Sequence, residues 1–139
     1  MEHREGKPPK LLVIVRHPEK GNGENGRTIC KKILDKLAKI DGPVCFFHDA
    51  TDMATANTGY AGAFKDLDKA LEKRTIEIVC AIPSTIPRMM AQTVAMVSSK
   101  RWKIFKDREA SLGYLSSIGY TLSASEFKTL ADVTLRIVE

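Results

Sequence analysis

Three residues in this sequence have the types and order that phosphoryl-transfer chemistry uses. Arg16 and His17 follow directly after an apolar run, and Arg88 stands beside a proline-containing turn further along the chain. A histidine nitrogen can accept a phosphoryl group, and guanidinium groups neutralise the charge on its oxygens. The three residues are therefore a candidate catalytic site. The alternative is structural: Arg16 and His17 are polar residues at the point where a strand leaves its sheet.

A resemblance bears on the catalytic alternative. Residues 15–20 (VRHPEK) resemble the Arg-His motif that ends the first strand of histidine phosphatases, and residues 83–88 are similar to the second arginine segment of that family. The family's chemistry also needs a second histidine late in the chain, whereas no histidine follows His48. Pro18 stands where the family has glycine or alanine, and it restricts His17 to extended backbone. We therefore favour the structural alternative.

A polar loop is the second candidate site, and its residue types suit binding. The loop runs from Asp49 to Gly59, and an amphipathic helix follows it. Thr58 stands where this helix begins, so its hydroxyl either caps the helix or accepts a phosphate. We expect His48 to be a strand-end side chain and Asp49 to be a loop or capping carboxylate. The candidate contact residues are Asp49, Thr51, Asp52, Thr55, Asn57, Thr58 and Gly59.

Alternating strands and helices must position these candidates. Short apolar, β-favouring runs predict strands at 11–15, 44–48, 76–82 and 102–105. Apolar residues at helical spacing predict helices at 28–40, 60–71, 86–97 and 107–115, with Thr28 as the first N-cap. This alternation builds a single small, mostly parallel, four-stranded sheet with helices packed on it. The first strand is apolar throughout, so both of its faces should be covered.

Two further segments fall outside the alternation. Residues 18–27 are rich in Gly and Asn and predict an irregular exposed loop, without the spacing of a P-loop or a dinucleotide fold. Ser123 and Glu126 form a capping-box pattern that predicts a final helix within an appended segment, 121–139. This helix either covers the open face of the sheet or packs against a second copy of the chain. Its apolar positions are Phe127, Leu130, Val133 or Thr134, and Ile137.

Between Gly42 and Leu115 the chain resembles the STAS domain, in particular its SpoIIAA-like branch of anti-sigma factor antagonists. The similarity lies in the order of the strand that ends at Asp49, of Asn57-Thr58 where the family has Asp-Ser, and of residues 102–105 before the last of these helices. The resemblance implies one STAS-like domain, residues 11–139, whose sheet is packed on one side by helices. It implies a bacterial-type signalling protein in which Thr58 is the phospho-acceptor, with a kinase, an anti-sigma-like protein or another regulator as partner.

The composition sets limits on function. Of 139 residues, 43% are hydrophobic and 28% are charged, which excludes wholesale disorder and coiled coil. No apolar run is long enough to span a bilayer, so we expect no membrane partner. The net charge of +5 is spread along predicted helices beside acidic residues, so we do not expect nucleic-acid binding. Residues 1–10 predict a flexible lead-in without a signal-peptide core, which indicates a cytoplasmic protein.

The cysteines complete the prediction. Cys30, Cys45 and Cys80 lie within apolar patterns without metal-ligand spacing, so we expect buried free thiols, no metal site and no cofactor. The leading hypothesis is a non-catalytic, STAS-like regulatory or protein-interaction module. Two alternatives stay open: a histidine-phosphatase-like enzyme, and a module that binds a small ligand or lipid.

Overall fold

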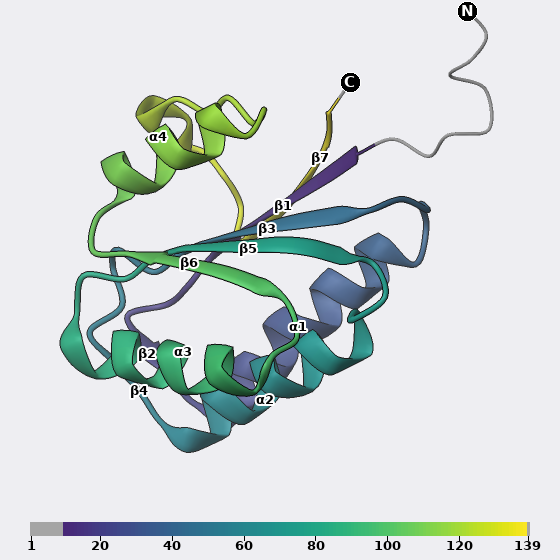
Figure 1. The fold of residues 1–139 in the computed structure, drawn as a ribbon. Coiled ribbons are helices and arrows are strands. Elements are labelled where there is room, and N and C mark those ends of the chain that lie inside the picture. Colours follow the sequence, from purple (N-terminus) through teal and green to yellow (C-terminus); the bar gives the residue numbers. More distant parts are fainter. Residues whose placement is uncertain (1–9, 139) are drawn as a thin grey trace, which may run out of the picture.

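The computed structural model describes residues 10–138, and its centre is a mixed five-stranded sheet (Figure 1). The strand order is β6-β5-β3-β1-β7. Four strands are parallel, and the fifth runs antiparallel to β1. The predicted α/β class is confirmed, but the sheet is mixed and has one strand more than predicted. The strands are β1 (Lys10–Arg16), β3 (Val44–Asp49), β5 (Thr75–Ala81), β6 (Arg101–Phe105) and β7 (Val133–Val138).

Helices cover both faces of this sheet. On one face lie α1 (Gly23–Leu37), α2 (Thr58–Ala70) and α3 (Thr85–Val97), and on the other lie α4 (Arg108–Ser117) and the short 3₁₀ helix η2 (Ala124–Lys128), as Figure 1 shows. The implied packing of helices on one side only is therefore wrong. Helices are needed on both faces because β1 is apolar throughout, and its alternate residues belong to two separate apolar cores.

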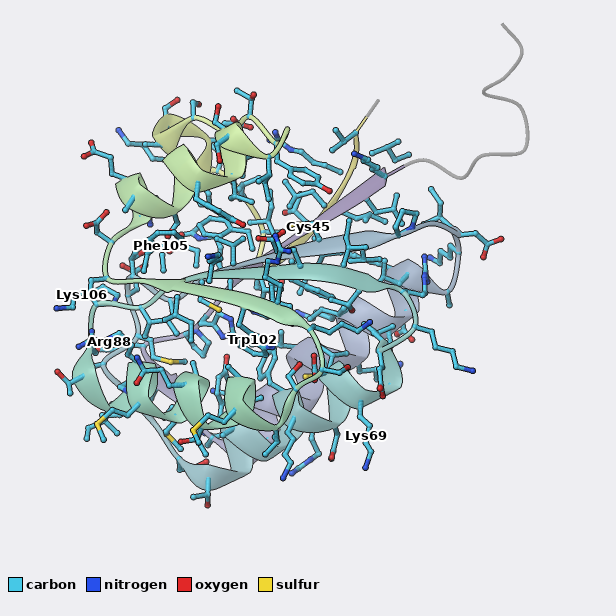
Figure 2. The ribbon with its side chains drawn as sticks, in the orientation of Figure 1. Cys45, Lys69, Arg88, Trp102, Phe105 and Lys106 are labelled. Carbon is cyan, nitrogen blue, oxygen red and sulfur yellow. The ribbon has the colours of Figure 1, made fainter. Side chains whose placement is uncertain are left out.

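Side chains on the two faces of the sheet belong to different cores (Figure 2). Trp102 lies on the side of β6 that faces α3, whereas Phe105 and Cys45 lie on the opposite side, towards α4. The three cysteines are free and buried, as predicted. Burial, with a smaller contribution from the nearby Asp66, raises the pKa of Cys30 to about 12, so this thiol stays protonated at neutral pH.

The segment predicted as an irregular loop, 18–27, is largely ordered secondary structure. β2 (Lys20–Gly21) pairs with β4 (Thr55–Ala56) in a separate small sheet, and α1 begins directly afterwards. Asn22 is the N-cap, because its side chain accepts a hydrogen bond from the backbone N–H of Asn25 at 2.9 Å. Thr28, the predicted cap, lies inside the helix. The predicted irregular loop is wrong because asparagine, although unfavourable inside a helix, is one of the strongest N-caps and here begins α1.

The predicted C-terminal helix is also wrong. The capping box of Ser123 and Glu126 forms, but it caps only the single turn of η2. The chain then enters β7, whose residues pair with β1 from Lys10↔Val138 to Val15↔Val133. The apolar residues of this segment fit a period of two as well as a helical period, and β1 offered an unpaired edge. These residues complete the sheet and do not form a dimerisation helix.

Two further predictions concern the ends of the described chain and its relation to a membrane. The predicted lead-in, 1–10, lies outside the described residues except for Lys10, which begins β1. Within residues 10–138, no helix has both the length and the apolar character needed to cross a bilayer.

Candidate functional site

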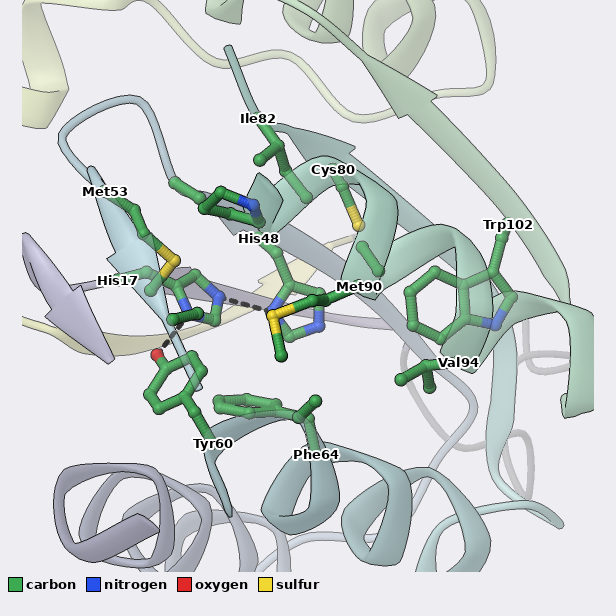
Figure 3. A pocket seen from close by; sticks show the side chains of 15 residues that line it. His17, His48, Met53, Tyr60, Phe64, Cys80, Ile82, Met90, Val94 and Trp102 are labelled. Carbon is green, nitrogen blue, oxygen red and sulfur yellow. Dashed lines mark hydrogen bonds between the residues drawn. The ribbon is translucent and has the colours of Figure 1, made fainter. Parts of the chain in front are cut away.

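A cavity of about 80 Å³ lies between the sheet and helices α2 and α3, beside the carboxyl ends of β1, β3 and β5 (Figure 3). In parallel sheets, ligands bind outside these strand ends. The walls are almost entirely apolar, with three polar aromatic side chains at one end. The lining residues are Ala50, Met53, Ala56, Ala61, Phe64, Cys80, Ile82, Pro87, Met90, Ala91, Val94 and Trp102, together with His17, His48 and Tyr60.

The three polar side chains form one hydrogen-bonded chain. Nδ1 of His17 lies 2.5 Å from the hydroxyl oxygen of Tyr60, and Nε2 of His17 lies 2.9 Å from Nδ1 of His48. The ring of Phe64 packs against all three, with ring centroids 5.0 to 5.5 Å away. Figure 3 shows this chain along one wall of the cavity and Trp102 at the far end.

The parallel register of β1 and β3 brings the two histidines together. Val15 is opposite His48, and the backbone N–H of His17 donates to the carbonyl of Asp49 at 2.9 Å. Val15 and His17 are two residues apart, so both point to the face that α2 covers. Each parallel strand therefore delivers one imidazole to the same edge of the sheet.

Tyr60 is held by two features of its own surroundings. Its backbone N–H donates to the side-chain oxygen of Asn57, the N-cap of α2, at 3.0 Å. Its ring lies against Gly21, where a Cβ would come within 2.7 to 2.9 Å of three ring atoms. The absence of a side chain at residue 21 thus creates the space from which Tyr60 reaches His17.

Burial keeps these groups uncharged. It lowers the pKa of His48 to about 4. Burial also lowers the pKa of His17 well below its ordinary value, with a smaller contribution from His48. The pKa of Tyr60 is raised, again mainly by burial. At neutral pH His17 and His48 are therefore neutral imidazoles and Tyr60 is a neutral phenol. The three hydrogen-bonded side chains introduce no net charge into the cavity.

Such a chain can exist in two hydrogen-bond directions. Either the Tyr60 hydroxyl donates to His17 and His17 donates to His48, or every bond points the other way. In both arrangements, both nitrogens of His17 are engaged. The remaining nitrogen of His48, Nε2, is the end of the chain that is left to contact a ligand.

The other two residues of the candidate phosphatase site are directed elsewhere. Arg16 donates to the carbonyl of Leu130 at 3.1 Å, on the opposite face of the sheet, because adjacent strand residues alternate. Arg88 donates to the carbonyls of Ile82 and Pro83 at 3.1 and 2.8 Å, and so holds the turn between β5 and α3. Neither arginine is among the residues that line the cavity in the described chain.

The predicted contact loop divides into a buried part and an exposed part. Asp49 is only 3% exposed, and its carboxylate accepts hydrogen bonds from Thr51 and from Arg108 of α4. This network ties the end of β3 to the start of α4, with the carboxylate of Asp49 buried and Thr51 and Arg108 partly exposed. The remaining candidates lie at the surface: Asp52, Thr55, Asn57, Thr58 and Gly59.

Thr58 itself is the first residue of α2 and not its cap. The cap is Asn57, which has extended backbone and accepts the bond from Tyr60 described above. The Thr58 hydroxyl is exposed at the helix N-terminus, and we find no bond between it and another described residue. The expectation that it caps the helix is wrong, while its role as phospho-acceptor stays a prediction.

A second, smaller cavity adjoins the first. It has a volume of about 20 Å³ and shares His48, Phe64 and Trp102 with the larger one. Two of its lining residues, Asp68 and Trp102, each have a buried polar atom without a hydrogen-bond partner in the described chain: Oδ1 of Asp68 and Nε1 of Trp102.

One feature of the sequence indicates this site: the position of its two histidines at the ends of apolar runs. His17 and His48 each end, or directly follow, an apolar run in two successive strands of a predicted parallel sheet. Strands that are successive in the chain are often neighbours, so the histidines could have been placed together. Tyr60, Asp68 and Trp102 had no such signal, since their polar atoms follow from packing.

Among the described residues, no group of three or more His, Cys, Asp or Glu side chains is arranged to hold a metal ion.

Comparisons with known proteins give no further assignment. No protein-family model matches the chain, and neither the curated proteins nor the solved structures contain a match to it.

Proposed function

We propose that the protein is a non-catalytic module that binds a small apolar ligand in the cavity between the sheet and helices α2 and α3. The observation that carries this proposal is a concave apolar site in which His17, His48 and Tyr60 satisfy one another and stay neutral. A site of this kind, concave and apolar with few polar groups, is the usual form of a small-molecule pocket.

A second observation that supports the proposal is that helix α3, which forms one wall of the cavity, is held by few buried contacts. Only Pro87 and Val94 of this helix are buried, and the side chain of its N-cap, Ser84, donates to the carbonyl of Met53 instead of capping the helix. An element with few buried contacts opens at a lower free energy than the core strands. A ligand could therefore enter between α3 and the loop before α2 without unfolding the sheet.

The test uses Trp102, the one tryptophan in the sequence, as a fluorescent reporter. It lines the cavity, so binding of an uncharged probe such as 1-methoxypentane should change its emission in a saturable way. Ala91→Leu fills the cavity from α3 and should weaken binding at least tenfold. Gln92→Leu adds a similar side chain on the exposed side of α3 and is the matched control. A signal that does not saturate, or equal binding by the Ala91→Leu variant, would contradict the proposal.

A second candidate function is the STAS-like interaction module, and the surface of α3 favours it. Four large apolar side chains of α3 are exposed: Ile86, Met89, Met96 and Val97. The hydrogen bond from Ser84 to Met53 joins this surface to the loop 49–59. Large exposed apolar patches are typical of protein contact sites.

Phosphorylation of Thr58 would place a charge of about −2 at the end of the loop 49–59, where the α2 N-terminus stabilises it within the chain. Thr58→Glu should therefore abolish capture of a partner from the native host while leaving the melting temperature unchanged. Thr55→Glu, also exposed in the same loop, is the control and should retain the partner. Equal capture by both variants would remove the switch from consideration.

A further inference from the structure

We propose that the ligand carries a hydroxyl group, which binds in the smaller cavity between Asp68 and Trp102 while its apolar chain fills the larger one. This inference rests on the proposed ligand-binding function and specifies the chemical class of the ligand. The smaller cavity is about 20 Å³, which is room for one oxygen-sized group.

The two polar atoms without partners require complementary hydrogen bonds. Oδ1 of Asp68 is an acceptor without a donor, and Nε1 of Trp102 is a donor without an acceptor. Leaving such buried groups unpaired costs about 1–3 kcal/mol each. A hydroxyl donates one bond and accepts others, so one atom can satisfy both sites. An ether oxygen could only accept, and an ammonium group could only donate.

The charges around the two cavities also favour a neutral hydroxyl over a carboxylate. No lysine or arginine lines either cavity in the described chain, and His48, which lines both, is neutral at pH 7. A carboxylate ligand would therefore meet Asp68 without any cation to offset the repulsion. The small volume also leaves no room for the water that a charged group retains. The site thus selects an alcohol over an acid of the same length.

The two cavities share three aromatic walls, His48, Phe64 and Trp102. In the proposed pose the hydroxyl binds at Asp68 and the alkyl chain passes these rings towards Met90. Figure 3 shows Trp102 and Val94 at this end of the larger cavity, with Met90 towards its centre. The ligand class that fits is a short aliphatic alcohol.

The experiment compares four probes of matched length by isothermal titration calorimetry: 1-hexanol, 1-methoxypentane, hexylammonium and hexanoate. We expect 1-hexanol to bind about tenfold more tightly than 1-methoxypentane, the effect of the one hydrogen bond to Asp68 that the ether cannot donate. We expect hexanoate to show no measurable binding. Asp68→Ala should bring the affinities for the alcohol and the ether to within about twofold of each other. Trp102→Phe, which keeps an aromatic wall but removes the N–H, should weaken 1-hexanol about fivefold.

Asp66→Ala is the matched control, since Asp66 is exposed on the same helix and lines neither cavity. Equal affinities for 1-hexanol and 1-methoxypentane in the unaltered protein would overturn the hydroxyl inference and leave the binding function intact. Tighter binding of hexylammonium would overturn it in favour of an amine. Failure of every probe to bind would overturn the function and the inference together.

Discussion

At the scale of single residues, the histidine pair is the least ordinary feature of the described chain. His48 is 9% exposed, and the ring of Phe46 stacks on it with centroids 5.6 Å apart. An imidazole in such surroundings forfeits the hydration of its charged form, and the hydrogen bond to His17 favours a neutral pair. The two side chains therefore couple the stability of the fold to pH.

The sign of this coupling follows from the lowered pKa values. In the unfolded chain both histidines titrate near pH 6.5, whereas in the folded protein the pKa of His48 is about 4. The unfolded state therefore binds more protons between these values, and the free energy of unfolding falls as the pH falls from about 6.5 to about 4. We expect His48 alone to account for a loss of about 3 kcal/mol, measured by urea unfolding across this range.

The control for this prediction is the double variant His17→Gln/His48→Gln, which keeps polar side chains of similar size but removes both titrations. Its stability should change less between pH 6.5 and pH 4 than that of the unaltered protein. Carboxylates with lowered pKa values, such as Glu126, add the same slope to both proteins, so the difference isolates the histidines. Parallel stability profiles for the two proteins would show that the pair is not held neutral by the fold.

At the scale of elements, the contact between α1 and α2 explains why Gly26 lies inside α1. Glycine has a low helix propensity, so its presence there needs a packing reason. A Cβ on Gly26 would lie 3.2 Å from Cβ of Ala63 and 3.0 Å from the ring of Tyr60. The glycine allows α1 and α2 to approach closely beside the ring of Tyr60, whose hydroxyl is hydrogen-bonded to His17. The glycines that predict an irregular loop at 18–27 therefore serve close packing within β2 and α1.

Substitution of Gly21 tests this arrangement directly. Gly21→Ala should push the Tyr60 ring away from its position and cost about 1–3 kcal/mol of stability, since added volume strains a packed site. The hydrogen bond to His17 would lengthen, which tyrosine and histidine NMR shifts can report.

Gly62→Ala is the control, because residue 62 is within α2 and its Cβ would meet nothing within 4 Å. Alanine is the better helix former, so this variant should gain roughly 0.5–1 kcal/mol. If both substitutions had the same effect on stability, the close contact between Gly21 and Tyr60 would not be what positions the phenol.

At the scale of the whole molecule, the sequence was most informative where one physical signal dominated. The run at 11–15 is apolar at every position, and β1 is indeed buried on both faces. The tail was ambiguous because Val133 and Ile137 fit both a helical spacing and strand alternation, whereas Leu135 fits only the strand, and the unpaired side of β1 decides between them. The structure of the loop 49–59 and the hydrogen bonds that join Tyr60, His17 and His48 depend on contacts between distant parts of the fold. No local sequence pattern contains this information.

The two outer strands of the sheet have different protection. β6 and β7 each pair with one neighbouring strand, and the outer side of each pairs with no strand among residues 10–138. α1 contacts β7, and β6 is the edge strand that carries positive charges on alternate residues. Exposed Arg101 and Lys103 occupy alternate positions of β6. Charges at such positions oppose the addition of a foreign strand, and so act as gatekeepers against aggregation.

Loss of these gatekeepers should turn β6 into a template. Arg101→Thr/Lys103→Thr should leave the monomer folded but promote β-rich assemblies, detected by light scattering and thioflavin fluorescence. Lys65→Thr/Lys69→Thr removes the same charge from exposed positions on α2 and should remain dispersed. Two positive charges in one short strand would then be what keeps neighbouring molecules from extending the sheet at β6 into a fibril.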